Sequence, residues 1–271
     1  MSKMITGKNI WITGAGSGIG KELALALAAA DNKVVISGRD QEKLNSVWVN
    51  YPENITTLTC DVSDDSAVES VRASLLAELG FLDIAIFCAG HCEYVENGQM
   101  QASLFRRVYD VNVFGVVNSA AIVMPLLRRS ADTGANPQQS KAQIVGISSL
   151  SAVVGLPRAE AYGSSKAAMN YLLESLRLDI VKQGIDVTVV NPGFVKTPMT
   201  AQNDFPMPFL MEPETAAKRI ISGIASRKLK VQFPKRLLFV LSLAAWFPGL
   251  WSRKGSAMLS RTKRVTPMAE R

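Results

Sequence analysis

Tyr162 and Lys166 are four residues apart in a segment that reads YGSSK. Residues at this spacing lie on one face of a helix, so a phenol and an amine can point into the same site. A free tyrosine has a pKa of about 10, which is too high for efficient proton transfer near neutral pH. A nearby ammonium favours the phenolate, so the spacing predicts that Lys166 lowers the pKa of Tyr162. The pair also occurs by chance, and its interpretation depends on the rest of the chain.

A glycine-rich segment, TGAGSGIG, runs from Thr13 to Gly20. It follows the apolar run Asn9–Thr13, a predicted strand, and leads into Ile19–Ala30, whose composition favours a helix. Glycines let the backbone approach a pyrophosphate closely, and a helix N-terminus supplies free N–H groups. Glycine-rich turns also occur without a ligand. The position between the first strand and the first helix nevertheless predicts dinucleotide binding.

The elements that position these residues form an alternating series of short apolar runs and longer helical patterns. Continuous apolar runs such as IAIF and VTVV are typical of parallel strands covered on both faces. The alternation predicts an α/β fold, a Rossmann-like doubly wound parallel sheet of about seven strands with helices on both faces. The polar segment Ser130–Lys141 is predicted to be a surface loop. The predicted strands are Asn9–Thr13, Lys33–Ser37, Thr56–Cys60, Leu82–Cys88, Ala142–Ser148, Asp186–Asn191 and Lys230–Phe233.

The composition fits a globular protein in a reducing compartment. The 271 residues are 48% hydrophobic and 20% charged, which allows a sizeable core. Three cysteines are too few for a disulfide framework, and no signal peptide precedes the glycine-rich segment, so we expect a cytoplasmic location. Cys88, His91 and Cys92 could be taken for a metal cluster, but a fourth ligand is missing and no metal is expected.

The net charge of +7 is unevenly distributed. From Lys218 to Arg271 there are 13 Lys and Arg residues and one acid, Glu270, whereas the preceding residues hold 17 basic and 22 acidic side chains. The basic character therefore belongs to the C-terminal part. No nucleic-acid-binding motif accompanies it, so a nucleic-acid partner is not expected.

The glycines at 14, 18 and 20, together with Tyr162 and Lys166, resemble the motifs of the short-chain dehydrogenase/reductase family. The resemblance extends from about Lys8 to Glu214. It implies an oxidoreductase that transfers a hydride between a nicotinamide cofactor and a carbonyl or alcohol. In the family the catalytic serine ends a strand 13 residues before the tyrosine, which is the place of Ser149; its hydroxyl would stabilise an oxyanion. Asn112 matches the family's helical asparagine near the lysine, although it could simply satisfy a kink in the backbone.

The resemblance also implies further contacts with the cofactor. Asp61 and Val62 resemble the adenine-contacting pair, and Cys88-Ala89-Gly90 takes the place of an N-A-G element with Cys88 where Asn is usual. The segment Asn191–Thr197 resembles the P-G-x-x-x-T element. The cofactor-binding residues implied in this way are Gly14, Ser17, Gly18, Ile19, Gly20, Arg39, Asp61, Val62, Ala89, Gly90, Tyr162, Lys166, Pro192, Gly193, Val195 and Thr197.

The end of the second predicted strand indicates which cofactor binds. Enzymes that use NAD generally place an acid there to hold the ribose 2′-hydroxyl, and this chain has Gly38. Arg39 follows and would suit a 2′-phosphate, unless it is only a solvated side chain at a helix start. Asp40 is the better N-cap for the next helix. The sequence therefore favours NADP(H) over NAD(H).

The substrate side is less visible in the sequence. The resemblance implies one cofactor-binding and catalytic domain over residues 1–234, with a mobile lid at about 194–212. The lid is apolar and suggests an apolar or lipid-like substrate, although its side chains could equally pack on the body. The apolar lid residues are Met199, Phe205, Met207, Pro208, Phe209, Leu210 and Met211.

Residues 235–271 are predicted to form a helical extension that is apolar and basic. The run Leu237–Phe247 is too short to span a bilayer. Trp246, Trp251 and the flanking basic residues suit a helix lying on an anionic membrane, so residues 235–251 are a candidate peripheral contact at the inner face of a membrane. The alternative is packing in the core or in an oligomer contact.

Partners and competing functions follow from the same resemblance. It implies a homodimer or homotetramer assembled through the helices near Asn112 and Tyr162. A non-catalytic regulator that binds NADP(H) and a membrane-attached scaffold are the competing functions. The complete set of Asn112, Ser149, Tyr162 and Lys166 argues against the regulator.

Overall fold

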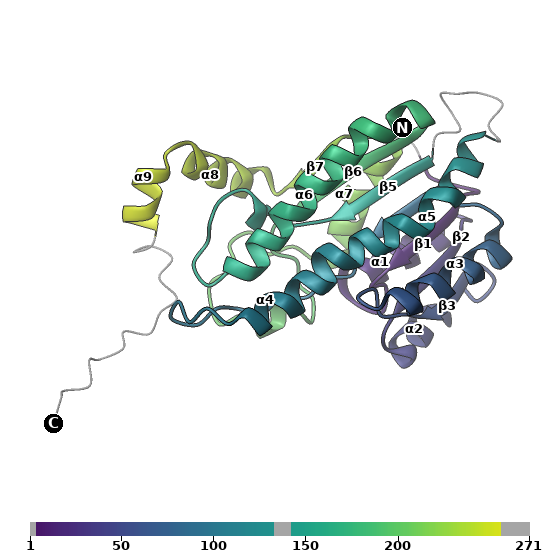
Figure 1. Cartoon of the computed structure of the whole chain (residues 1–271), viewed down its shortest axis with the longest axis horizontal. Coiled ribbons are helices and arrows are strands. Elements are labelled where there is room, and N and C mark those ends of the chain that lie inside the picture. The colour runs from purple at the N-terminus through teal and green to yellow at the C-terminus, as the bar shows by residue number, and fades with distance from the viewer. Residues whose placement is uncertain (1–3, 133–141, 256–271) are drawn as a thin grey trace.

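The computed structural model describes residues 4–132 and 142–255, and its centre is a seven-stranded parallel sheet (Figure 1). The strand order is β3-β2-β1-β4-β5-β6-β7. The chain therefore builds the sheet outwards from β1 in both directions, as the doubly wound prediction requires. The strands are β1 (Asn9–Thr13), β2 (Lys33–Gly38), β3 (Ile55–Thr59), β4 (Ile84–Phe87), β5 (Ala142–Ile147), β6 (Ile185–Pro192) and β7 (Lys230–Phe233).

Helices cover both faces of this sheet because successive strand residues point to opposite sides. In β1, Ile10 and Ile12 face one cluster of buried residues and Trp11 faces the other. The first cluster is closed by α1 (Gly18–Ala28), α2 (Gln41–Trp48) and α7 (Pro213–Ala225). The second is closed by α3 (Asp65–Leu79), α5 (Gly115–Asp132) and α6 (Glu160–Ile180). Both faces of each central strand are thus buried, which explains their continuously apolar sequences.

The predicted loop Ser130–Lys141 differs partly from the structure. Residues Ser130–Asp132 form the end of α5, and the rest of the segment lies outside the described residues. Helix α5 is preceded by α4 (Ala102–Tyr109) and a π-helical turn over Asp110–Phe114. By length and composition, the continuous stretch Ala102–Arg128 is the one part of the described chain that could cross a membrane. Half of its most apolar window is buried in the protein, and core helices pass the same test.

The C-terminal extension begins directly after the sheet. It contains α8 (Lys235–Trp246), α9 (Pro248–Leu250) and a π-helical turn over Trp251–Gly255. Figure 1 shows α8 and α9 at one end of the molecule, apart from the helices that cover the sheet. The remainder of the predicted extension, residues 256–271, lies outside the described residues.

Candidate functional site

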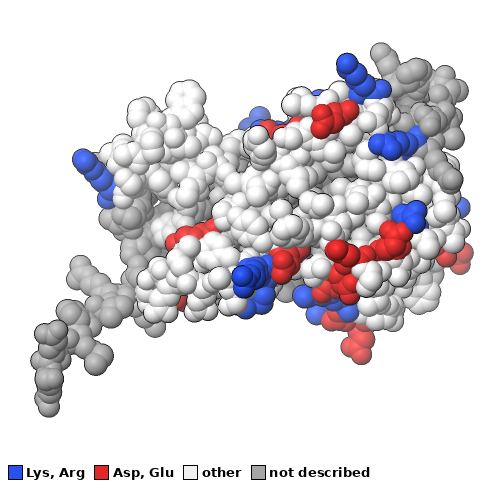
Figure 2. All heavy atoms as spheres, viewed as in Figure 1, with Lys and Arg blue, Asp and Glu red and all other residues white. Residues whose placement is uncertain are grey.

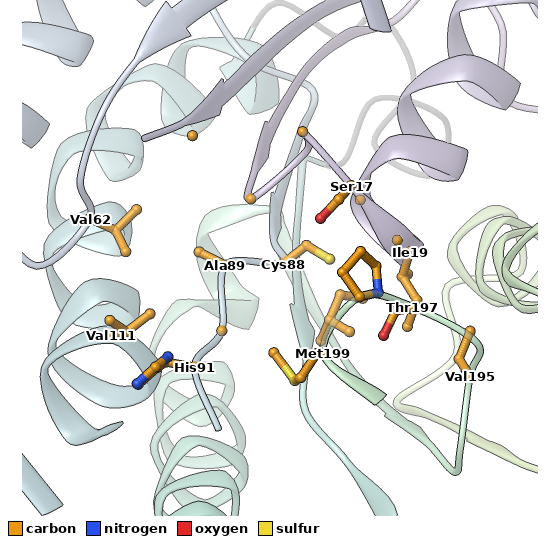
Figure 3. A pocket seen from close by; sticks show the side chains of 18 of the residues that line it. Ser17, Ile19, Val62, Cys88, Ala89, His91, Val111, Val195, Thr197 and Met199 are labelled. Atoms are coloured by element: carbon orange, nitrogen blue, oxygen red, sulfur yellow. The ribbon is translucent and has the colours of Figure 1, made fainter. Parts of the chain in front are cut away.

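A cavity of about 320 Å³ lies at the carboxyl ends of the strands. The strand order reverses between β1 and β4, and open α/β sheets bind ligands at such a point. Every residue predicted from the sequence to contact the cofactor lines this cavity, together with Ser149. Figure 3 shows Ser17, Ile19, Val62, Val111, Val195 and Thr197 around the central residues Cys88 and Ala89.

The glycine-rich turn packs against the end of β4 with no room for side chains. Gly14 has a φ of +67°, and a Cβ atom there would lie 2.6 Å from the Cα of Ala89. Thr13 fixes the same contact, because its Oγ1 accepts hydrogen bonds from the backbone N–H groups of Cys88 and Ala89, both at 3.1 Å. The turn and the strand end therefore hold each other in place.

The start of α1 opens into the cavity. Ser17 is the N-cap residue, but its side chain makes no capping hydrogen bond, and Gly18, Ile19 and Gly20 line the cavity behind it. The first N–H groups of a helix have no partner within the helix and favour an anion. The residues present therefore fit the pyrophosphate of a dinucleotide.

The opposite end of the cavity carries two basic side chains. Arg39 follows β2, is 71% exposed in its side chain, and lies 4.0 Å from a carboxylate oxygen of Asp61. Asp40 is the N-cap of α2 and accepts a hydrogen bond from the backbone N–H of Lys43 at 3.1 Å, as predicted. Lys43 also lines the cavity. The sequence interpretation missed Lys43, although its position one helical turn after Arg39 could have indicated it.

Lys166 is buried beside Tyr162 on α6. Its Nζ donates a hydrogen bond to the carbonyl of Ile147 at 3.0 Å and lies 5.9 Å from the centre of the Tyr162 ring. Burial lowers the pKa of this amine to about 8. Ser148 anchors the helix at the same point, because its hydroxyl donates to the backbone carbonyl of Lys166 at 3.1 Å.

The pKa of Tyr162 differs from the sequence prediction. Burial raises it above its usual value, and a hydrogen bond with the Ser149 side chain opposes that rise. Burial dominates the shift because a phenolate in a buried site loses its hydration, and no lowering by Lys166 offsets it. Tyr162 is therefore a phenol at neutral pH in this structure, a form that can donate a proton.

Asn112 lies at the π-helical turn between α4 and α5 and is fully buried. Its amide nitrogen donates to the carbonyl of His91 at 2.8 Å and to the hydroxyl of Ser165 at 2.9 Å, and its Oδ1 accepts from the N–H of His91 at 2.8 Å. Asn112 does not line the cavity but joins α6 to the segment after β4. Single π-helical turns often occur at functional sites. These contacts fit the alternative of a satisfied backbone kink, and the catalytic role of Asn112 stays a prediction.

A second cavity of about 150 Å³ adjoins the first and shares five residues with it, Ser149, Tyr162, Gly193, Met199 and Thr200. Its other walls are largely apolar. They come from the segment after β4, the loop before α6, the predicted lid and α8, and include Cys92, Tyr94, Leu150, Leu156, Phe194, Phe205, Pro206, Pro208, Leu237 and Leu241. The sequence interpretation missed Cys92, Tyr94, Leu237 and Leu241, because no motif marks which side chains of a loop or apolar helix face a cavity.

The predicted lid is held down by polar contacts. Tyr94 donates a hydrogen bond to Asn203 at 2.7 Å and stacks edge-on against Phe205, with ring centres 5.6 Å apart. Arg158 bridges the lid to the segment after β4 by ion pairs with Asp204, at 2.8 Å, and with Glu96. The apolar residues of the lid are placed in three ways: Met199, Phe205 and Pro208 line the cavity, Met211 packs on the core, and Phe209 and Leu210 are exposed. An apolar substrate stays a prediction.

Cys88, His91 and Cys92, the three residues that could be taken for a metal cluster, do not all line one cavity. Cys88 and His91 line the first cavity and Cys92 the second. Within residues 4–132 and 142–255, no group of three or more His, Cys, Asp or Glu side chains could hold a metal ion.

The contact between Gly14 and Ala89 can be tested by substitution. Gly14→Ala would place a methyl group against backbone atoms in a conformation that favours glycine, and we expect it to lower the free energy of unfolding by about 1–3 kcal/mol. Gly155→Ala is the matched control, because a Cβ at Gly155 meets nothing within 4 Å. Urea unfolding measures both variants. Equal stability of the two would contradict the close packing of the turn.

Comparison with known proteins agrees with this geometry. Residues 8–206 match the family model described as short chain dehydrogenase. An uncharacterized oxidoreductase of Myxococcus xanthus is 34% identical over 88% of this chain and 91% of its own length.

Solved structures show the same fold. The Pseudomonas aeruginosa RhlG/NADP active-site complex has a TM-score of 0.77 and 26% identity, covering 85% of this chain and 95% of that one. The 3-ketoacyl-(acyl-carrier-protein) reductase of Brucella melitensis, complexed with NADH, has a TM-score of 0.75 and 22% identity, covering 84% and 96%. The glycine-rich turn at the larger cavity and the family match agree: this chain is an oxidoreductase that belongs to the short-chain dehydrogenase/reductase family.

Proposed function

We propose that this protein is an NADP(H)-dependent oxidoreductase that interconverts a carbonyl and an alcohol on an apolar substrate. The observation that carries the proposal is the junction of the two cavities, which share the hydroxyl groups of Ser149 and Tyr162. The larger cavity has the glycine-rich turn and free helix N-terminus that a dinucleotide needs, and the smaller one has apolar walls. The division into a domain of residues 1–234 and an extension is part of this proposal.

Each catalytic residue has a distinct task in carbonyl reduction. Bound NADPH would supply the hydride to the carbonyl carbon. Ser149 donates a hydrogen bond to the carbonyl oxygen and stabilises the negative charge that develops there. Tyr162 then gives its phenolic proton to the same oxygen. This step requires a protonated tyrosine, and burial favours that state because it raises the pKa of Tyr162. Alcohol oxidation uses the same steps in reverse.

Lys166 and Asn112 support that proton transfer. The buried ammonium of Lys166 lies next to the Tyr162 ring and stabilises the phenolate that remains after the proton has left. Asn112 holds the helix of Tyr162 and Lys166 against the segment after β4 through Ser165 and His91. It acts as a positioning residue.

The second cavity supports an apolar substrate with a small polar part. Most of its lining side chains are aliphatic, aromatic or proline. Ser151 also lines it, and the Oγ of Ser151 is buried without a hydrogen-bond partner among the described residues. A substrate polar group close to the reacting carbonyl would satisfy this hydroxyl.

Oligomer formation is supported by an apolar surface on the helices near Asn112 and Tyr162. Phe114 and Val117 on one side and Tyr171, Leu178 and Val181 on the other are large, apolar and exposed. Such a surface fits contact with a second copy in a homodimer or homotetramer. We also propose that the protein is cytoplasmic and lies at the inner face of a membrane.

Substitution of Tyr162 tests the proton donor. Tyr162→Phe removes the phenolic proton and leaves the ring, so NADPH-dependent reduction should fall by about 10²–10⁴-fold while NADPH binding persists. Tyr51→Phe, in the segment before β3 and outside both cavities, is the matched control and should retain full turnover. Near-normal turnover in Tyr162→Phe would overturn the mechanism and favour a non-catalytic role.

Substitution of Arg39 tests the choice of cofactor. Loss of its charge-assisted hydrogen bonds to a 2′-phosphate should raise the Kd of NADPH by about 10- to 100-fold in Arg39→Ala. The Kd of NADH, which has no 2′-phosphate, should change little, and Arg39→Lys should fall between the two. Fluorescence titration with both cofactors measures this. An unchanged Kd of NADPH in Arg39→Ala would show that the Arg39 side chain is solvated and does not bind the 2′-phosphate.

The pH dependence of turnover tests Lys166. Its pKa is lowered to about 8, so the ammonium present below pH 8 is lost as the pH rises through that value. We therefore expect kcat/KM for NADPH, which reports the free enzyme, to fall above about pH 8. Burial raises the pKa of Cys88 to about 12, so this thiol does not titrate in the same range. A flat profile to pH 10, with the protein still folded by circular dichroism, would exclude the role of the ammonium.

A further inference from the structure

After Lys235 and Arg236, helix α8 is apolar apart from Ser242, and among the described residues none covers one of its faces. Phe239, Leu243 and Trp246 recur at helical spacing on α8 and are 70%, 49% and 81% exposed, and Leu250 in α9 is 56% exposed. We call these four residues the outer stripe. A helix that is apolar all round is normally covered on every side, either by protein or by lipid. The outer stripe therefore needs an apolar partner.

The inner face of the same helix forms a wall of the second cavity. Leu237 and Leu241 line that cavity, and Leu241 and Ala244 are buried against the body. The helix is fixed at both ends. A Cβ at Gly193 would lie 2.9 Å from Pro234, and Trp251 donates a hydrogen bond from Nε1 to the carbonyl of Gly155 at 2.9 Å. The single helix α8 thus separates the cavity from the outer stripe.

We propose that the outer stripe docks on an anionic lipid bilayer and so places the second cavity against the membrane surface. The docking itself stands on the segment from α8 to Arg253; the meaning of the cavity as a substrate site rests on the proposed function. The distribution of charge supports docking on a membrane. Figure 2 shows that the end of the molecule that carries α8 is largely free of charged side chains, with a basic group at its tip.

The charges that flank the stripe indicate the sign of the surface. Lys235 and Arg236 begin α8, Arg253 follows Trp251, and all three are exposed. The sequence has no Asp or Glu between Glu214 and Glu270, so no carboxylate of this segment neutralises these three positive charges. An apolar stripe with a tryptophan and basic ends is the pattern of helices that lie in the interface of anionic membranes.

A second copy of the chain fits this surface less well. In a two-fold contact the same patch faces itself, so the basic ends of one α8 would meet the basic ends of the other without any carboxylate from the segment. The apolar surface on α5 and α6 already supplies a face for oligomer contacts. A bilayer satisfies both the apolar stripe and the basic ends.

Docking also defines the substrate class. A carbonyl or alcohol that partitions into acyl chains would reach the cavity past Leu237 and Leu241 without crossing water. Turnover of an alkyl ketone with a long chain should then rise when anionic vesicles are present, whereas turnover of cyclohexanone, which stays in water, should not.

The decisive measurement is co-sedimentation of the full chain with vesicles. Pure phosphatidylcholine vesicles are compared with vesicles that also contain phosphatidylglycerol. We expect binding to the mixed vesicles, reduced by about ten-fold or more in Leu243→Ser/Trp246→Ser. Val49→Ser/Leu76→Ser is the matched control, since both residues are apolar and exposed and lie at α2 and in α3, outside the second cavity, and it should bind like the wild type. Lys235→Gln/Arg236→Gln should lose on the order of five-fold per side chain on anionic vesicles.

Two results would overturn the proposal. One is failure of the wild type to bind anionic vesicles, and the other is full binding by Leu243→Ser/Trp246→Ser. A shift of that variant from oligomer to monomer, with no vesicle binding by the wild type, would assign the stripe to a second copy. Tryptophan emission gives a reading that does not depend on the folding of a double variant: vesicles should shift wild-type emission to shorter wavelength, and Trp246→Phe should abolish the shift. Vesicle binding requires no turnover, so inactivity towards every carbonyl would count against the proposed function alone.

Discussion

Burying the amino group of Lys166 costs free energy, and the elements around it are arranged to offset that cost. The strand β5 ends at Ile147, which leaves the carbonyl of that residue available to accept from the amine. Helix α6 reaches this carbonyl because Gly146 has no side chain in the way of Leu173 and Met169. The buried amine therefore requires a strand end, a helix and a glycine in one particular register.

Hydrogen bonds also connect the helix that carries Lys166 to the glycine-rich end of the first cavity. Asn112 links α6 to the segment after β4, and Thr13 links that segment to β1. The chain of hydrogen bonds thus runs from Tyr162 and Lys166 to the glycine-rich turn. Groups far apart in the sequence occupy one crevice because parallel strands present their carboxyl ends at a single edge.

Much of this could be predicted from the sequence, and the reasons are local. The strands follow from continuous apolar runs, so the predicted and observed boundaries differ by at most two residues, as for Leu82–Cys88 against Ile84–Phe87. Asp40 was correctly assigned as an N-cap because capping depends on neighbouring residues alone. The direction of the Tyr162 pKa was wrong because spacing reveals a charged neighbour but not the depth of burial. The role of α8 was also undetermined, since a run that is apolar on every side does not indicate which side faces a cavity.

The hydrogen bond between Trp251 and Gly155 ties the C-terminal segment to the body of the protein. Its partner lies in the loop between Ser149 and Tyr162, the same loop from which Arg158 reaches the lid. Removal of the chain beyond Phe233 would leave the lining of the first cavity complete. It would open the second cavity on the side where Leu237 and Leu241 line it. Substrate profiles measured on such a fragment would therefore describe an enzyme with a different selectivity from the one that this sequence encodes.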